Sequence, residues 1–196
     1  MILQNHPEIA FAVELDKLKT IVRKTKIYSA DRLENTAEHS WHLATSVWAL
    51  KDYSNEPINI ERAIKMSLAH DIVEIDAGDI FVYDSKATES KAELEQNAAK
   101  RLFAISPNDS STEMHALWIA YENQECPESR FVGALDRFLP MLANYFTDFF
   151  SWKTHNVTFD QVFNRNKKIE TGSVKLWAIA QTIIQEGVRR GLLLKK

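Results

Sequence analysis

Hydrophobic positions recur along the chain at the three- and four-residue spacing of α-helices, and the alternation typical of strands is hard to find. The first stripe of this kind comprises Ile9, Val13, Leu18, Ile21 and Val22. Further stripes run through residues 60–68, 94–105, 114–121, 131–142, 159–163 and 174–184. Such spacing gives each helix an apolar face that can be buried against its neighbours. The pattern therefore predicts an all-α fold built as a helical bundle.

Local signals mark where several of these helices begin. Asn35 is followed three residues later by Glu38, the arrangement of a capping box. Asn59 precedes another apolar stripe, and Pro127 stands where a first-turn proline is favoured. Only five glycines and five prolines interrupt the 196 residues, so connections are expected to be short. We predict one domain over residues 1–196, without repeats or linkers.

The charge balance and the cysteine content restrict the partners and the compartment. The chain has 24 Lys and Arg against 27 Asp and Glu, a net charge of −3, so a basic face for nucleic acid is not expected. The single Cys126 is compatible with a reducing compartment. No signal peptide is recognisable, and no apolar run approaches the roughly 20 residues that span a bilayer. We therefore expect a cytoplasmic protein without a membrane partner.

The candidate chemistry lies among histidines and acids. His70 is followed directly by Asp71, and Glu74 lies four residues after His70, so on a helix Glu74 would share the face of both. Such groups are costly to bury unless they are paired or bound to metal. His39 and Asp136 lie on other predicted helices and would complete a site of two imidazoles and two carboxylates. That donor set suits Mn, Co, Fe, Ni or Zn, although a His-Asp pair also occurs by chance on helix surfaces.

Three segments of the chain resemble a known family. RLENTAEHSWH (32–42), HDIVEIDAGDI (70–80) and ESRFVGALDR (128–137) carry the order His39, His70-Asp71, Asp136. These segments resemble the HD-domain metal-dependent phosphohydrolase superfamily, and in particular its 5′-deoxynucleotidase-like branch. The likeness runs from about Phe11 to Leu192. It implies a single all-α HD-type domain.

The resemblance also implies roles for individual residues. His39, His70, Asp71 and Asp136 would hold one divalent metal ion, with Mg added to the candidates above, and Glu74 would orient or deprotonate the attacking water. Asp79 would lie where that branch contacts the sugar of a nucleotide. The Arg-Trp pair with which the family binds phosphate aligns with Lys24-Thr25, so Lys24 or its neighbour Arg23 would offset the phosphate charge. Trp41, two residues after His39, is a further candidate for contact with substrate.

The function expected from this resemblance is release of phosphate from a phosphomonoester, a (deoxy)nucleoside 5′-monophosphate. The partner is then a small phosphate ester. Alternatives are hydrolysis of another phosphate ester or of a cyclic nucleotide, a non-catalytic module that senses nucleotides and binds metal, and a two-metal oxygenase. The oxygenase is disfavoured because His115 is the only histidine between Asp71 and Asp136.

An aromatic-rich span suggests how the protein associates. Residues 138–152 include Phe138, Tyr145, Phe146, Phe149, Phe150 and Trp152. This is more large apolar surface than one buried helix face needs, so part of it is expected at an interface. Relatives in the resembled branch form dimers, and a homodimer is therefore expected.

Overall fold

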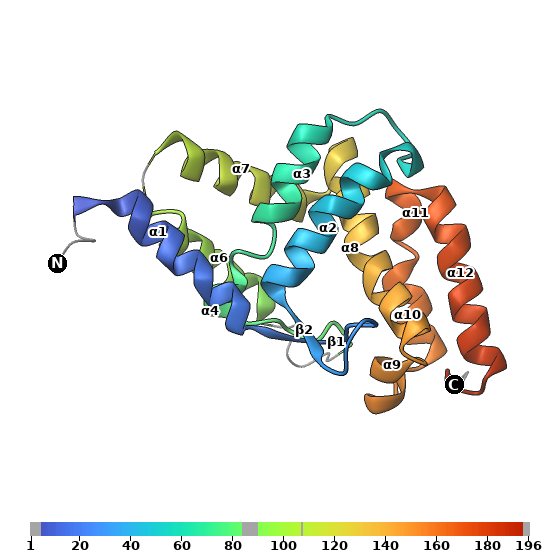
Figure 1. The fold of residues 1–196 in the computed structure, drawn as a ribbon. Helices are drawn as coiled ribbons and strands as arrows, with labels where there is room; N and C mark the ends of the chain where they lie inside the picture. Colours follow the sequence, from blue (N-terminus) through green and yellow to red (C-terminus); the bar gives the residue numbers. More distant parts are fainter. Residues whose placement is uncertain (1–4, 84–89, 107, 194–196) are drawn as a thin grey trace.

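Helices make up most of the computed structural model, which describes residues 5–83, 90–106 and 108–193 (Figure 1). In chain order they are α1 (Pro7–Leu15), α2 (Thr36–Ala49), α3 (Ile60–Ala69), α4 (Glu74–Ala77), α6 (Lys91–Leu102), α7 (Asp109–Asn123), α8 (Pro127–Phe146), α9 (Phe150–Thr154), α10 (Phe159–Asn166), α11 (Ile169–Gly172) and α12 (Val174–Arg189). Two short 3₁₀ helices, η2 (Asp16–Thr20) and η3 (Lys51–Tyr53), follow α1 and α2. The prediction of an all-α fold is confirmed.

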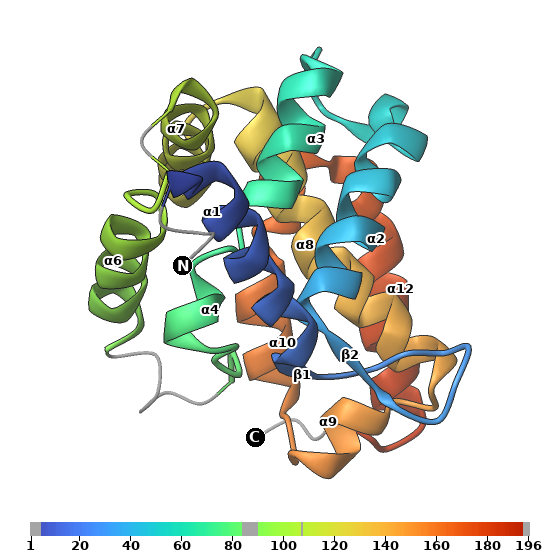
Figure 2. The same cartoon turned by 60° about the vertical axis from the view of Figure 1, so that its left-hand side comes forward.

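Helix α8 lies at the centre of the bundle and packs against α2, α3, α7, α11 and α12 (Figure 2). It begins at Pro127, as predicted, with the proline in its first turn. Phe131 and Leu135 are fully buried on it, and they belong to one apolar cluster that includes residues as distant as Phe11 and Leu193. A residue in the middle of α8 is therefore surrounded by protein on most sides. The single-domain boundary of 1–196 stays a prediction.

The predicted helix starts at Asn35 and Asn59 are confirmed. The Asn35 side chain accepts a hydrogen bond from the Glu38 backbone N–H, and the Glu38 carboxylate accepts one from the backbone N–H of Asn35. The Asn59 side chain accepts from the Arg62 backbone N–H at the start of α3. Both caps satisfy donors that the first helical turn leaves open. The first of them fixes the start of α2, one turn before His39.

A small antiparallel hairpin was not predicted. Strands β1 (Val22–Lys26) and β2 (Leu33–Asn35) pair with Val22 opposite Asn35 and Lys26 opposite Leu33. The hydrophobic pattern did not reveal the hairpin because β2 has only three residues and β1 carries three cations. It matters for the site, since it brings the segment around residue 23 beside the start of α2.

The stripe predicted over residues 9–22 is wrong in detail. The helix α1 ends at Leu15, and its Ile9 and Val13 are 50% and 53% exposed, whereas Phe11 and Leu18 are buried. Beyond Thr20 the chain becomes extended, as suits the β-branched pair at 21–22. A similar shift of face leaves the predicted core residues Leu68 of α3 and Leu94 of α6 exposed.

The aromatic span 138–152 is mostly core. Phe138, Phe149 and Trp152 are buried, so the expectation that the span exceeds one buried face is wrong for them. Tyr145 and Phe146, at the end of α8, are 39% and 62% exposed. Only this part of the span, within the described chain, offers apolar surface to a partner.

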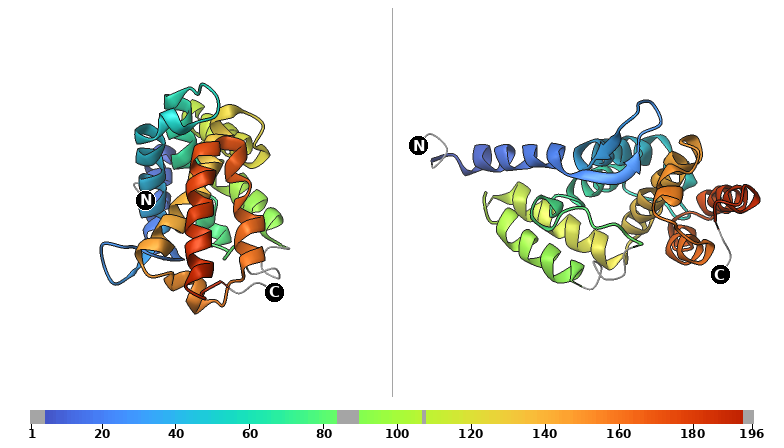
Figure 3. Two further views of the ribbon diagram at one scale, coloured as in Figure 1. Left: turned by 90° about the vertical axis from the view of Figure 1, so that its right-hand side faces the viewer. Right: turned by 90° about the horizontal axis from the view of Figure 1, so that it is seen from below.

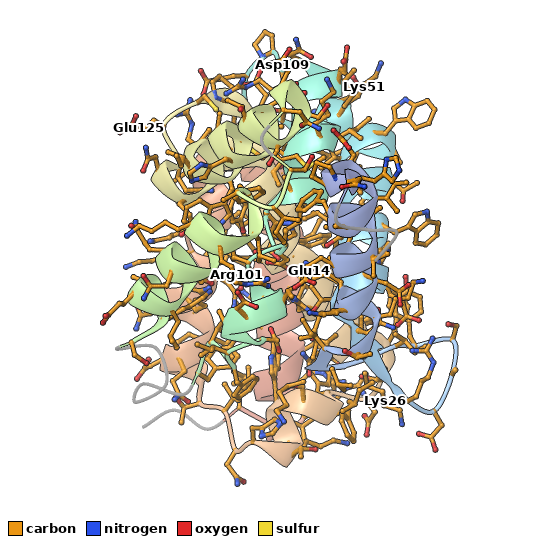
Figure 4. All side chains as sticks on the ribbon, turned by 90° about the vertical axis from the view of Figure 1, so that its left-hand side faces the viewer. Glu14, Lys26, Lys51, Arg101, Asp109 and Glu125 are labelled. Carbon is orange, nitrogen blue, oxygen red and sulfur yellow. The ribbon has the colours of Figure 1, made fainter. Side chains whose placement is uncertain are left out.

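Helix α1 and helix α12 lie at opposite ends of the molecule (Figure 3). Arg101 of α6 ties α1 to the body: its guanidinium lies 2.6 Å from Glu14 of α1 and also binds Asp76 of α4 (Figure 4). No helix within the described ranges has both the length and the hydropathy needed to cross a membrane.

Candidate functional site

Three helices bring His39, His70 and Asp136 together. His39 lies in the first turn of α2, His70 at the end of α3, and Asp136 in the middle of α8. His39 Nε2 is 3.0 Å from Asp136 Oδ1, and His70 Nε2 is 3.9 Å from the same oxygen. One ligand atom from each of the three residues lies within 4.8 Å of the others. The structure therefore brings His39 of segment 32–42 and His70 of segment 70–80 to Asp136, as predicted.

His70 presents its Nε2 to this cluster. Its Nδ1 is 2.7 Å from the Ser67 carbonyl oxygen, which can only accept, so Nδ1 carries the hydrogen. In the neutral ring Nε2 then holds the lone pair. This atom is buried and has no hydrogen-bond partner in the described chain. A buried imidazole with one nitrogen held by a carbonyl and the other unpartnered has the arrangement of a metal ligand.

Asp71 and Glu74 reach the site differently from the sequence expectation of one continuous helix wall. Helix α3 ends at Ala69, the chain turns through residues 71–73, and Glu74 begins the separate helix α4. The turn is closed by the Glu74 N–H, which donates to the Asp71 carbonyl at 3.0 Å. Asp71 still faces the imidazoles: its Oδ2 lies 3.1 Å from His70 Nε2 and 3.8 Å from His39 Nε2.

These four side chains fit a divalent cation. Two imidazole nitrogens and two carboxylates form the mixed donor set that borderline ions accept. Charge supports this reading, because the interactions of Asp71 with His70 and with the Arg23 guanidinium outweigh burial and hold the pKa of Asp71 below its ordinary value. Hydrogen bonding to His39 does the same for the pKa of Asp136 against its burial. Both acids are therefore carboxylates at neutral pH, as ligands must be.

His39 carries a proton in the metal-free chain. Burial and the Arg23 charge oppose this, but the hydrogen bonds with Asp136 and Glu34 outweigh them and raise the pKa of His39 to about 9. The ring would have to lose a proton from Nε2 before that nitrogen binds a cation.

Sequence reasoning missed two side chains that hold the ligands in place. Glu34 of β2 is buried, and its Oε2 lies 3.6 Å from His39 Nδ1. The Tyr121 hydroxyl of α7 donates to Asp136 Oδ2 at 2.8 Å. Carboxylates and hydroxyls in such positions orient metal ligands. Tyr121 was assigned to an apolar stripe by its spacing, and no local signal distinguishes its hydroxyl role.

Glu74 lies in the interior beside this cluster. Glu74 is 5% exposed, and its Oε2 accepts a hydrogen bond from the Thr36 hydroxyl at 2.8 Å. Burial, followed by the negative charge of Asp71, raises the pKa of Glu74 well above its ordinary value. A perturbed carboxyl in such a place is a candidate for proton transfer.

Of the predicted cations, Arg23 lies inside the site and Lys24 at its edge. Arg23 Nη1 is 3.1 Å from Asp71 Oδ2 and 3.7 Å from Asp79 Oδ1, and its Nε is 3.3 Å from Glu34 Oε2. Burial opposes the charge on Arg23, but the charges of Asp71 and Asp79 outweigh it and raise the pKa of Arg23 further. Lys24 is exposed. The alternation of β1 decides this, because neighbouring strand residues point to opposite faces.

A cavity opens beside the ligands. Its walls include Arg23, Lys24, Asp79 and Asp136, and its empty space, counting the part open to solvent, is about 640 Å³. Burial raises the pKa of Asp79 although the Arg23 charge opposes it. Trp41 is 66% exposed and borders a different hollow, together with Glu38.

Comparisons with known proteins agree with this geometry. The sequence profile of the HD-domain family matches residues 15–177. A human protein named 5′-deoxynucleotidase HDDC2 is 31% identical over 122 residues, which cover 62% of this chain and 58% of the human protein. The Saccharomyces cerevisiae protein 5′-deoxynucleotidase YBR242W is 30% identical over 181 residues, 88% of this chain and 73% of the yeast protein.

A solved structure extends the likeness over the fold. The crystal structure of a "predicted metal-dependent phosphohydrolase" from Magnetospirillum magnetotacticum MS-1 superposes with a TM-score of 0.90 and 46% identity, covering 96% of this chain and 95% of that one. The chain spans about three-fifths of the length of the vertebrate relatives it matches. The resemblance to the 5′-deoxynucleotidase-like branch is thus confirmed by relatives that carry this name. With its profile match over most of the chain and its His39, His70-Asp71, Asp136 centre, the chain belongs to the HD-domain family.

Proposed function

We propose that this chain is a metal-dependent phosphohydrolase that releases phosphate from a (deoxy)nucleoside 5′-monophosphate. The observation that carries the proposal is the buried, unpartnered Nε2 of His70, which faces His39, Asp71 and Asp136. The names of the relatives, 5′-deoxynucleotidase and metal-dependent phosphohydrolase, support the substrate class and the reaction.

His39, His70, Asp71 and Asp136 would hold one divalent cation. When bound, such an ion supplies Lewis-acid polarisation of a phosphoryl oxygen and acidifies water. The candidates are Mn, Co, Fe, Ni, Zn and Mg, and the two imidazoles favour the transition metals over Mg.

Glu74 would accept the proton of the attacking water. Its Oε2 is engaged by the Thr36 hydroxyl, which leaves Oε1 for the proton. In the metal-free chain burial and the charge of Asp71 raise the pKa of Glu74, so positive charge placed nearby would favour the carboxylate that acts as base.

Arg23 would offset the charge of the phosphate. Its Nη1 and Nε face carboxylates, and no contact within the described ranges engages Nη2. A guanidinium can bind a phosphate oxygen through such a donor while keeping its other partners. Lys24, at the edge of the same cavity, would add a point charge, and Asp79 would accept a hydrogen bond from a sugar hydroxyl.

A metal-by-substrate matrix tests the proposal. The chain is freed of metal with a chelator and reloaded with each candidate ion. It is then offered deoxy- and ribonucleoside 5′-monophosphates, a cyclic nucleotide and a generic phosphate ester. We expect phosphate release only with metal, and its loss in Asp71→Asn but not in Asp109→Asn, a change at the exposed start of α7. Tight nucleotide binding without turnover under any ion would instead favour a sensing module.

We also propose that the protein forms a homodimer through the exposed end of α8. Tyr145 and Phe146 border a hollow with Ile179 of α12, and all three are exposed. Phe146→Ser should lower the molar mass measured by light scattering from two chains to one, while Ile9→Ser on α1 should not. A monomeric wild-type chain would contradict this.

The single Cys126 supports a reducing, cytoplasmic compartment.

A further inference from the structure

The cavity beside the ligands continues along one face of α8. Asp136, Pro140, Met141 and Asn144 all line it. Pro140 lies four residues after Asp136, and Asn144 lies four after Pro140 and three after Met141, which are spacings that share a helix face. At a rise of 1.5 Å per residue, the separation of eight positions between Asp136 and Asn144 corresponds to roughly 12 Å. The cavity therefore has room for more than a phosphate group, in a direction that leads away from the candidate metal ligands.

Beyond α8, further walls of this extension come from elements that carry no metal ligand. Arg165 and Asn166 of α10 line it together with Tyr83. Asn166 is buried, and its side-chain amide donates to the Tyr83 hydroxyl at 3.3 Å and to the Val162 carbonyl at 2.8 Å. These bonds hold this wall in place independently of the candidate metal site.

Arg165 is the charged group of this wall. It is half-buried, and in the described part of the chain it forms neither an ion pair nor a hydrogen bond. Arg23, by contrast, is surrounded by three carboxylates. A guanidinium stays charged at every physiological pH and offers donors only. Partly removing it from water is costly unless oxygen acceptors are supplied.

We propose that this extension receives the leaving group of the phosphoester and that Arg165 selects leaving groups that present an oxygen acceptor. The inference rests on the proposed phosphohydrolase function and names a specificity-determining residue for it. The acceptor can come from a nucleobase carbonyl or from a second phosphate, which share this chemistry. Hydrogen bonds to a charged group of this kind discriminate by roughly ten- to hundredfold.

Three esters that share the same scissile 5′ phosphoester bond separate the contributions of a nucleobase and of a second phosphate. Thymidine 5′-monophosphate carries a base with carbonyl oxygens, 2-deoxyribose 1,5-bisphosphate carries a phosphate in its place, and 2-deoxyribose 5-phosphate carries neither. We expect the wild-type chain to prefer at least one of the first two over the third by roughly tenfold or more in kcat/KM. Which of the two is preferred identifies the source of the acceptor.

The variant Arg165→Met keeps the apolar length of the side chain and removes its donors. It should lower kcat/KM for the preferred ester by roughly tenfold or more, chiefly through KM, and leave 2-deoxyribose 5-phosphate unchanged. Arg165→Lys should recover part of the loss for the bisphosphate. Lys167→Met, at the exposed residue after α10, serves as the matched control. An equal fall for all three esters, or no change for any, would overturn the proposal.

A binding measurement separates this inference from the proposed function. Thymidine and 2-deoxyribose 1-phosphate, which lack the scissile phosphate, are titrated by NMR into the full chain and into Arg165→Met. Weaker binding to the variant supports the inference even if no ester is hydrolysed. Equal binding of both probes to both proteins contradicts it, whether or not phosphate is released.

Discussion

Replacing Glu74 by glutamine tests the electrostatics of the site through stability as well as activity. Glu74 is 5% exposed, and burial together with the charge of Asp71 raises its pKa well above the ordinary value. The folded chain therefore holds this proton more tightly than the unfolded chain, in which the pKa is about 4.3. The stability that the protonated form contributes is complete below that pH and is lost as pH rises through the folded pKa.

Glutamine removes this loss because it stays uncharged and can still accept the hydrogen bond from the Thr36 hydroxyl. Each unit by which the folded pKa exceeds the unfolded one corresponds to about 1.4 kcal/mol. For a chain of this size 1 kcal/mol shifts Tm by about 2–4 °C. Metal-free Glu74→Gln should therefore melt above the wild type at pH 8 by about 2 °C or more, and at pH 4 the two should melt together.

Calorimetric melting in the presence of a chelator, from pH 4 to pH 8, measures the difference. Glu125→Gln, at an exposed residue before α8, is the control and should follow the wild type throughout. With metal restored, Glu74→Gln should bind the ion but release no phosphate. A variant that melts below the wild type at pH 8 would refute the burial argument, and one that keeps full activity would remove Glu74 from the proposed proton transfer.

Two further substitutions have defined outcomes. Tyr121→Phe removes the hydrogen bond to Asp136 Oδ2 and should weaken metal affinity by about 10–100-fold, measured by competition with a chelating dye; unchanged affinity would show that the hydroxyl does not orient the ligand. Gly172→Ala would place a Cβ 2.0 Å from the Arg130 carbonyl oxygen, so the α11–α8 contact must open at a cost of about 1–3 kcal/mol or more. Gly133→Ala meets only a movable side chain and should melt within a few degrees of the wild type, whereas equal melting of both variants would contradict the packing argument.

What the sequence predicted well depended on local signals. The capping box at Asn35 and Glu38 is encoded within four residues, and the structure has both of its hydrogen bonds. The ligand set was predicted from residue types in order along the chain, and His39, His70 and Asp136 do meet. Burial within the helices was less predictable: Leu68 fits a helical stripe yet is 49% exposed, because a ten-residue helix accommodates more than one choice of buried face.

What the sequence did not predict depended on contacts between distant segments. Arg23 was placed beside Lys24 as an equal candidate, and only the hairpin decides which of the two faces the carboxylates. Glu34 and Tyr121 carry no motif of their own, and their roles arise from neighbours on other elements. The turn after α3 was hidden because His70, Asp71 and Glu74 satisfy helical spacing even though the helix ends.

The separation of the ligands along the chain has a consequence for folding. His39 and Asp136 are 97 residues apart, so an ion held by both would join two remote segments as a covalent cross-link does. The unfolded chain does not bring these ligands together and would bind the ion more weakly. At a free ion concentration of 1,000 times its dissociation constant, such binding adds about 4 kcal/mol to the native state. Starvation for the ion would then deplete the folded population as well as the activity, and a shortage of metal would be seen as faster proteolysis of the chain.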